Sequence, residues 1–134
     1  MANQSVDPRP LSPHLQVWRW HATMASSIFH RASGSINYIG AILVTVWLVL
    51  LAAGPDAYAV FENLMTGPVG LLVKLALFGF TLSLVYHLFN GVRHLVWDLG
   101  KGFDPKGSNQ RSMMIIIAAI VVTVGIWFLA GGIV

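Results

Sequence analysis

Three long apolar stretches dominate this 134-residue chain, near residues 29–53, 68–97 and 112–134. Each supplies the roughly 20 apolar residues that a helix needs to cross the hydrocarbon core of a bilayer. Only 10% of the residues are charged, and the mean hydropathy is +0.71. We therefore expect an all-α membrane protein, a single domain over residues 1–134, in which three transmembrane helices follow an interfacial N-terminal segment, residues 1–28.

The connections between the apolar stretches are short and rich in turn-forming residues. The first contains Gly54-Pro55-Asp56 and Gly67-Pro68, and the second contains Gly100, Gly102 and Asp104-Pro105. Neither connection is long enough for a soluble domain with its own core. Any soluble chemistry therefore belongs to other subunits.

Lysines and arginines are distributed unevenly along the chain. Seven of the eight lie before or at the start of the first apolar stretch, or around the second connection. They are Arg9, Arg19, Arg31, Arg93, Lys101, Lys106 and Arg111. The first connection carries Asp56 and Glu62 and no basic residue. Because cytoplasmic connections are enriched in basic residues, we expect the N-terminus and the second connection to be cytoplasmic. The positive charge thus reflects orientation in a lipid bilayer, and we expect no nucleic-acid partner.

The first ten residues contain no apolar run that resembles a signal peptide, so we expect no cleaved leader. A bacterial inner (cytoplasmic) membrane fits this pattern best. The chain contains no cysteine, which excludes thiolate metal sites, iron–sulfur clusters and the covalent attachment of c-type haem. Histidine is therefore the metal ligand that remains.

His87 lies inside the second apolar stretch, where an ionisable side chain is costly unless it faces a partner, a cavity or a metal. His94 lies about 10 Å further along a helix axis and about 20° around it, so both imidazoles share one face. They therefore cannot ligate opposite faces of one haem. His87 is either a buried histidine bonded to a neighbouring helix or an axial ligand of haem iron whose second ligand comes from elsewhere. His94, close to the helix end, also suits the membrane interface.

Small residues flank His87 on the same face. Ser83 and Gly91 lie four residues to either side of it, so the surface beside the imidazole is low. Such a surface suits either a flat ligand or a close contact with another helix.

A second polar cluster, Ser27, His30 and Arg31, opens the first apolar stretch. Arg31 offers a permanent charge and several donors to a propionate or a quinone carbonyl, and Ser27 adds a hydroxyl one turn earlier. His30 could donate or relay a proton. Alternatively, Arg31 extends to the interface and Ser27 caps a helix.

Taken together, these motifs closely resemble the cytochrome b556 subunit family of succinate dehydrogenase. The matching residues are Arg9-Pro10-Leu11-Ser12-Pro13-His14-Leu15, then Ser27-x-x-His30-Arg31-x-Ser33-Gly34, then His87-x-x-x-Gly91-Val92-Arg93-His94-Leu95-x-Trp97-Asp98-x-Gly100. The resemblance covers most of the chain. Trp18 stands where the family more often has tyrosine, which affects only a possible hydroxyl contact.

The resemblance implies a membrane anchor of succinate dehydrogenase (complex II). In this family two small anchor subunits hold a flavoprotein subunit and an iron–sulfur subunit at the membrane, bind haem b between them and pass electrons from succinate to ubiquinone. It implies that His87 is the axial haem ligand, that Ser27 and Arg31 bind quinone, and that His30 and His94 lie near the haem. The chain itself would not oxidise succinate.

The residues leave other functions open. One is a fumarate reductase anchor. Another is a self-contained cytochrome b that uses His30 and His87 as its two ligands. A third is a helical membrane protein without cofactor, in which the histidines serve packing or proton transfer.

Overall fold

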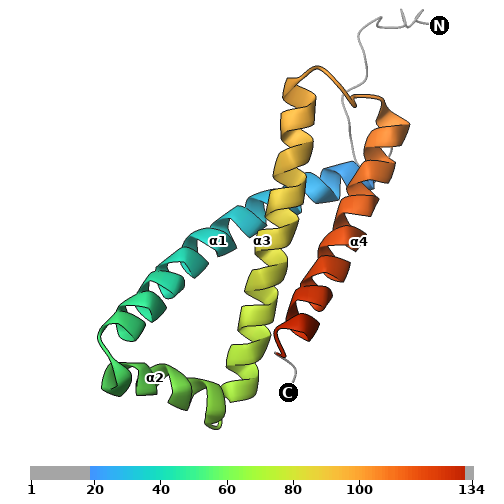
Figure 1. The fold of residues 1–134 in the computed structure, drawn as a ribbon. Helices are drawn as coiled ribbons and strands as arrows, with labels where there is room; N and C mark the ends of the chain where they lie inside the picture. The colour runs from blue at the N-terminus through green and yellow to red at the C-terminus, as the bar shows by residue number, and fades with distance from the viewer. Residues whose placement is uncertain (1–18, 132–134) are drawn as a thin grey trace, which may run out of the picture.

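The computed structural model describes residues 19–131 (Figure 1). This part of the chain is helical, with no strand, and forms α1 (Ala22–Ala52), α2 (Pro55–Thr66), α3 (Gly70–Asp98) and α4 (Pro105–Leu129). Helices α1, α3 and α4 are long and apolar enough to cross a membrane. The expected all-α architecture with three spans is therefore confirmed. The Arg9–Leu15 motif, Trp18 and residues 132–134 lie outside the described residues.

Helix α1 begins earlier than expected. It starts at Ala22, inside the segment assigned to the interface, because residues 22–28 contain neither proline nor glycine and continue the helix. The side chain of His21 caps it by accepting a hydrogen bond from the Met24 amide, with 3.3 Å between Nδ1 and N. The interpretation of Ser27 as a helix cap is therefore wrong.

Helix α2 was not expected, since only turn signals were recognised around it. Gly54 adopts a φ of 102°, Pro55 occupies the first turn, and Asp56 places a carboxylate at the positive end of the helix dipole. The ring of Phe61 on this helix packs edge-on against Trp47 of α1, with ring centroids 6.3 Å apart. At 12 residues, α2 is far too short to span a bilayer.

Helix α4 also begins before its apolar stretch. The Asp104 carboxylate caps it by accepting from the Gly107 amide at 2.7 Å. Arg111 then closes the connection from α3, donating to the Gly102 carbonyl at 2.6 Å and to Asp104 at 3.0 Å. Gly100 and Gly102 have φ values of 72° and 79°, which side chains rarely adopt, so this tight connection depends on glycine.

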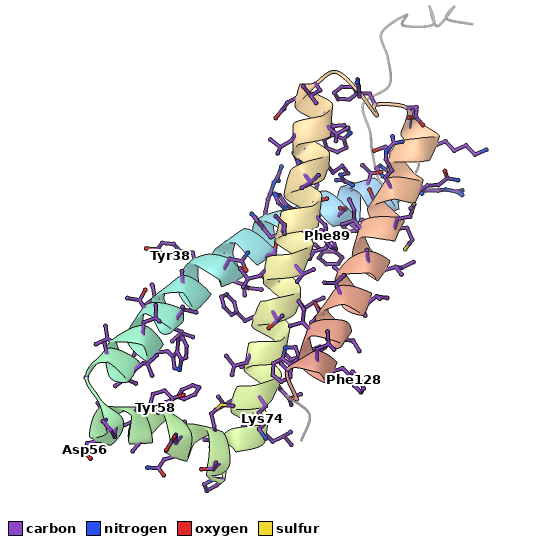
Figure 2. The ribbon with its side chains drawn as sticks, in the orientation of Figure 1. Tyr38, Asp56, Tyr58, Lys74, Phe89 and Phe128 are labelled. Carbon is purple, nitrogen blue, oxygen red and sulfur yellow. The ribbon has the colours of Figure 1, made fainter. Side chains whose placement is uncertain are left out.

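The described residues bury polar side chains and expose apolar ones. Tyr86 and Ala119 are the buried apolar residues among them, whereas Tyr38 and Phe128 are 73% and 78% exposed and point away from the helices in Figure 2. The buried polar residues are Ser26, Ser33, Ser83, Asn90, Arg93, Ser108, Ser112 and Thr123. Such a distribution is expected of helices surrounded by lipid, where polar groups are satisfied between helices.

The start of α1, the end of α3 and the start of α4 lie at one end of the molecule, and α2 lies across the other end (Figure 1). Figure 1 also shows α1 inclined across α3, with α4 running beside α3. The clustering of basic residues at the first of these ends agrees with the uneven charge distribution. Which end faces the cytoplasm stays a prediction.

Candidate functional site

The candidate site lies where α1 crosses α3. Half-buried His87 of α3 faces Ser33 of α1, with 3.0 Å between the Ser33 hydroxyl oxygen and His87 Nδ1. Next to Ser33, Gly34 lets the imidazole approach closely, because a Cβ at position 34 would lie 3.2 Å from His87 Cε1. No described residue forms a hydrogen bond with Nε2 of His87, which leaves this nitrogen available to a ligand.

The ring of His30 lies between the rings of His87 and His94. Its centroid is 4.0 Å from that of His87 and 4.9 Å from that of His94, with interplanar angles of 16° and 21°. The structure thus places His87 and His94 on the same side of α3, as their spacing predicts. Ligands on opposite faces of one haem must point toward each other across the porphyrin, whereas His30 and His87 form a stack. This geometry argues against the pair as the two axial ligands.

His94 is held by its own helix and by an aromatic neighbour. Its Nδ1 lies 2.8 Å from the Asn90 carbonyl, and its ring meets Trp97 edge-on at 5.0 Å. Trp97 in turn donates from Nε1 to the Gly102 carbonyl at 3.1 Å. His94 is thus connected to the loop that joins α3 to α4.

Ser27 and Arg31 lie near the start of α1, one helical turn apart. Ser27 is half-buried and Arg31 is exposed, and neither side chain forms a hydrogen bond or ion pair with a described residue. Four residues apart, they share one side of the helix. Both lie at the same end of α1 as His30.

The two small residues beside His87 differ in their surroundings. Ser83 contacts α1, with its hydroxyl oxygen 2.7 Å from the Asn37 side-chain oxygen and 3.1 Å from the Ser33 carbonyl oxygen. A Cβ at Gly91, by contrast, would meet nothing within 4 Å. Helix contact therefore accounts for Ser83, whereas Gly91 leaves open space beside the histidines.

The sequence interpretation missed a buried network on the α4 side of the crossing. Ser26 donates to the Asn90 side-chain oxygen at 3.0 Å, and Tyr86 donates its hydroxyl proton to the Ser26 carbonyl at 2.7 Å. A recognisable signal is present, because the buried small residues of α1 recur every seven positions, at Ser26, Ser33 and Gly40.

Arg93 is a buried residue between α3 and α4 rather than a surface cation. Only 5% exposed, it donates from Nη1 to Ser112 of α4 and lies over the ring of Trp97, with Cζ 4.5 Å from the centroid. Arg93 thus joins α3 to α4 close to the connection around which the basic residues cluster. Asp98, at the end of α3, is exposed, as expected of a solvated carboxylate.

Among residues 19–131, no group of three or more histidine, cysteine or acidic side chains is arranged to hold a metal ion. A haem brings four equatorial nitrogens of its own, so it asks the protein for axial ligands alone. His87, at the crossing of α1 and α3, could supply one such axial ligand.

The sequence is similar to those of known membrane subunits of one family. The family model described as succinate dehydrogenase/fumarate reductase transmembrane subunit matches residues 5–126. The mitochondrial succinate dehydrogenase cytochrome b560 subunit of Sus scrofa is 37% identical over 119 residues, which cover 88% of this chain and 69% of that protein. The succinate dehydrogenase cytochrome b556 subunit of Paracoccus denitrificans is 35% identical over 124 residues, 92% of this chain and 93% of that protein. The corresponding subunit of Rickettsia felis is 31% identical over 119 residues, 89% of this chain and 90% of its own.

Proposed function

The chain belongs to the succinate dehydrogenase/fumarate reductase transmembrane subunit family, and from this premise we propose that it binds haem b and contributes to quinone reduction as a cytochrome b anchor of succinate dehydrogenase. Its partners are then a second anchor subunit, an iron–sulfur subunit and a flavoprotein subunit. The bacterial relatives favour the inner membrane as its location. Succinate oxidation belongs to the flavoprotein, not to this chain.

His87 is the observation that carries the proposal. It stands inside a membrane-spanning helix, with Nδ1 bonded to Ser33 and Nε2 without a partner among the described residues. A neutral imidazole with one nitrogen occupied by the protein and the other exposed is suited to axial ligation. A b-type haem, when bound, supplies a one-electron carrier next to the quinone site.

The second axial ligand comes from another chain. His94 shares the side of α3 on which His87 lies, and His30 stacks on both rings, so neither reaches the opposite face of the same haem. The open surface at Gly91 gives a flat macrocycle access beside the histidines. We therefore assign the opposite ligand to the second anchor subunit and place His30 and His94 beside the haem.

Ser27 and Arg31 bind the quinone head group in this proposal. Arg31 donates to a quinone carbonyl and neutralises the negative charge that develops during reduction, and the Ser27 hydroxyl adds a second donor. Both lie near the start of α1, and in this proposal the iron–sulfur subunit would deliver electrons there.

Spectroscopy of the purified complex tests the haem assignment. We expect a b-type band in the reduced-minus-oxidised spectrum, with one haem for each pair of different anchor chains. His87→Ala should abolish this band, whereas His94→Ala, on the same side of the same helix, should retain it. A complex without b-type haem, or a b-type haem that stays bound to this chain when it is isolated from the second anchor, would contradict the proposal.

A further inference from the structure

The hydroxyl of Ser33 contacts two groups at the crossing of α1 and α3. Its oxygen lies 2.8 Å from the His30 carbonyl oxygen and 3.0 Å from His87 Nδ1. A serine hydroxyl has one proton to donate, and a carbonyl oxygen can only accept. Ser33 therefore donates to His30, and the contact with His87 requires a proton on Nδ1 that the hydroxyl oxygen accepts.

This count of donors determines the tautomer of His87. A neutral imidazole carries one N–H, so a proton on Nδ1 leaves Nε2 with its lone pair free. We propose that Ser33 is a positioning residue that holds His87 in this tautomer and orientation, presents Nε2 to haem iron and tunes the reduction potential of the haem. The inference rests on the proposed haem function and deepens it.

Ser33 is itself held firmly at the crossing. It is 5% exposed, and its carbonyl oxygen lies 3.1 Å from the hydroxyl oxygen of Ser83 on α3. Two residues of α3 therefore contact Ser33: Ser83 contacts its backbone carbonyl, and His87 contacts its side-chain hydroxyl. Since Gly34 allows His87 to lie close to α1, the imidazole has little freedom to rotate away from the hydroxyl.

The direction of the effect on the haem follows from the hydrogen bond. When the hydroxyl accepts the Nδ1 proton, the imidazole becomes a stronger electron donor, and a stronger donor stabilises the oxidised iron. Removing the hydroxyl should therefore make the haem potential more positive. We expect about a threefold change in the ratio of reduced to oxidised haem at a fixed potential, which is about 28 mV at 59 mV per tenfold for one electron.

The test compares variants of the whole complex in redox titrations and low-temperature spectra of the haem. Ser33→Ala should shift the midpoint potential positively and change the haem spectrum. Ser33→Thr should restore both, because a threonine hydroxyl in a helix also bonds the carbonyl three or four residues earlier. Thr45→Ala is the matched control, since it removes a hydroxyl of the same helix that bonds the Ala41 carbonyl at 2.8 Å and does not contact His87 or Ser33, and it should leave the potential unchanged.

Ser33→Val separates chemistry from packing, because valine has the shape of threonine without its hydroxyl. If Ser33→Ala prevents assembly, the Ser33→Thr and Ser33→Val variants still test the proposal. A midpoint potential and haem spectrum close to those of the unmodified complex in Ser33→Thr, but not in Ser33→Val, support it. Equal behaviour of the two, whether both keep or both lose the haem, contradicts it. An unshifted midpoint potential in Ser33→Ala also contradicts the role of Ser33, but it leaves the proposed haem function intact. Absence of haem from the unmodified complex would instead overturn the proposed function.

Discussion

Gly40 of α1 lies directly against the ring of Phe80 on α3, so closely that a Cβ added at position 40 would overlap the ring. Glycine is therefore required here by the approach of the two helices rather than by the backbone conformation. This contact lies on the same seven-residue repeat as Ser26 and Ser33, and it continues the α1–α3 interface beyond the histidines.

Gly40→Ala should therefore destabilise the chain by overpacking. We expect a loss of about 1–3 kcal/mol in the free energy of unfolding, since the Phe80 ring must move. Thermal unfolding of the complex measures the change. Gly79→Ala, where an added Cβ meets nothing within 4 Å, is the control and should be nearly neutral. Gly40→Ala combined with Phe80→Leu should recover part of the loss, and a double variant as unstable as the single one would contradict this explanation.

Arg31→Ala should lower quinone reductase activity by at least tenfold while succinate oxidation with an artificial electron acceptor stays close to normal. Arg31 is exposed and makes no ion pair with a described residue, so its removal should not disturb the fold. Lys106→Ala, an exposed cation at the same end of the molecule, is the control. Parallel loss of both activities would assign Arg31 to assembly instead.

Ser26→Ala should cost about 1–3 kcal/mol in the free energy of unfolding, because it leaves buried polar atoms without partners. Asn90 is fully buried, its side-chain oxygen accepts from Ser26, and its side-chain nitrogen has no partner among residues 19–131. Ser35→Ala removes an exposed hydroxyl from the same helix and should change stability by less than about 0.5 kcal/mol. Denaturation of both variants gives the comparison, and similar values would show that the buried bond contributes nothing.

The first turn of α4 should open in acid. The hydrogen bond from Arg111, supported by the Gly107 amide, lowers the pKa of the Asp104 carboxyl below its ordinary value. A depressed pKa means that this stabilisation is present above the unfolded pKa, about 3.9, and is lost as the pH falls through the lower folded pKa.

Hydrogen exchange of the Gly107 and Ser108 amides, corrected for the intrinsic rate at each pH, follows this opening. Protection should fall below about pH 4 in the unmodified protein. Asp104→Asn keeps a capping oxygen but cannot titrate, so its corrected protection should not depend on pH in this range. Equal pH dependence in both proteins would assign the opening to another group.

Hydropathy alone was sufficient to predict the three spans, because a helix must satisfy its backbone within the bilayer and so needs a long apolar run. The same criterion placed the starts of α1 and α4 too late. Both helices extend beyond their apolar stretches into residues that are polar yet compatible with a helix, and their starts depend on side-chain caps from His21 and Asp104. Helix α2 was missed because it is short and bounded by turn formers.

The sequence by itself determined that His87 and His94 share one side of a helix, since their seven-residue spacing is fixed by helical geometry. It also singled out Ser27, His30 and Arg31 as a polar group at the start of a span. Only the tertiary structure decided that His30 lies between the two imidazoles, that Arg93 joins α3 to α4, and that Ser33 bonds His87. Helical periodicity fixes which residues share a face of one helix. Which residues of another helix lie opposite that face depends on where the two helices cross. The position of the crossing is set by small residues far apart in the sequence.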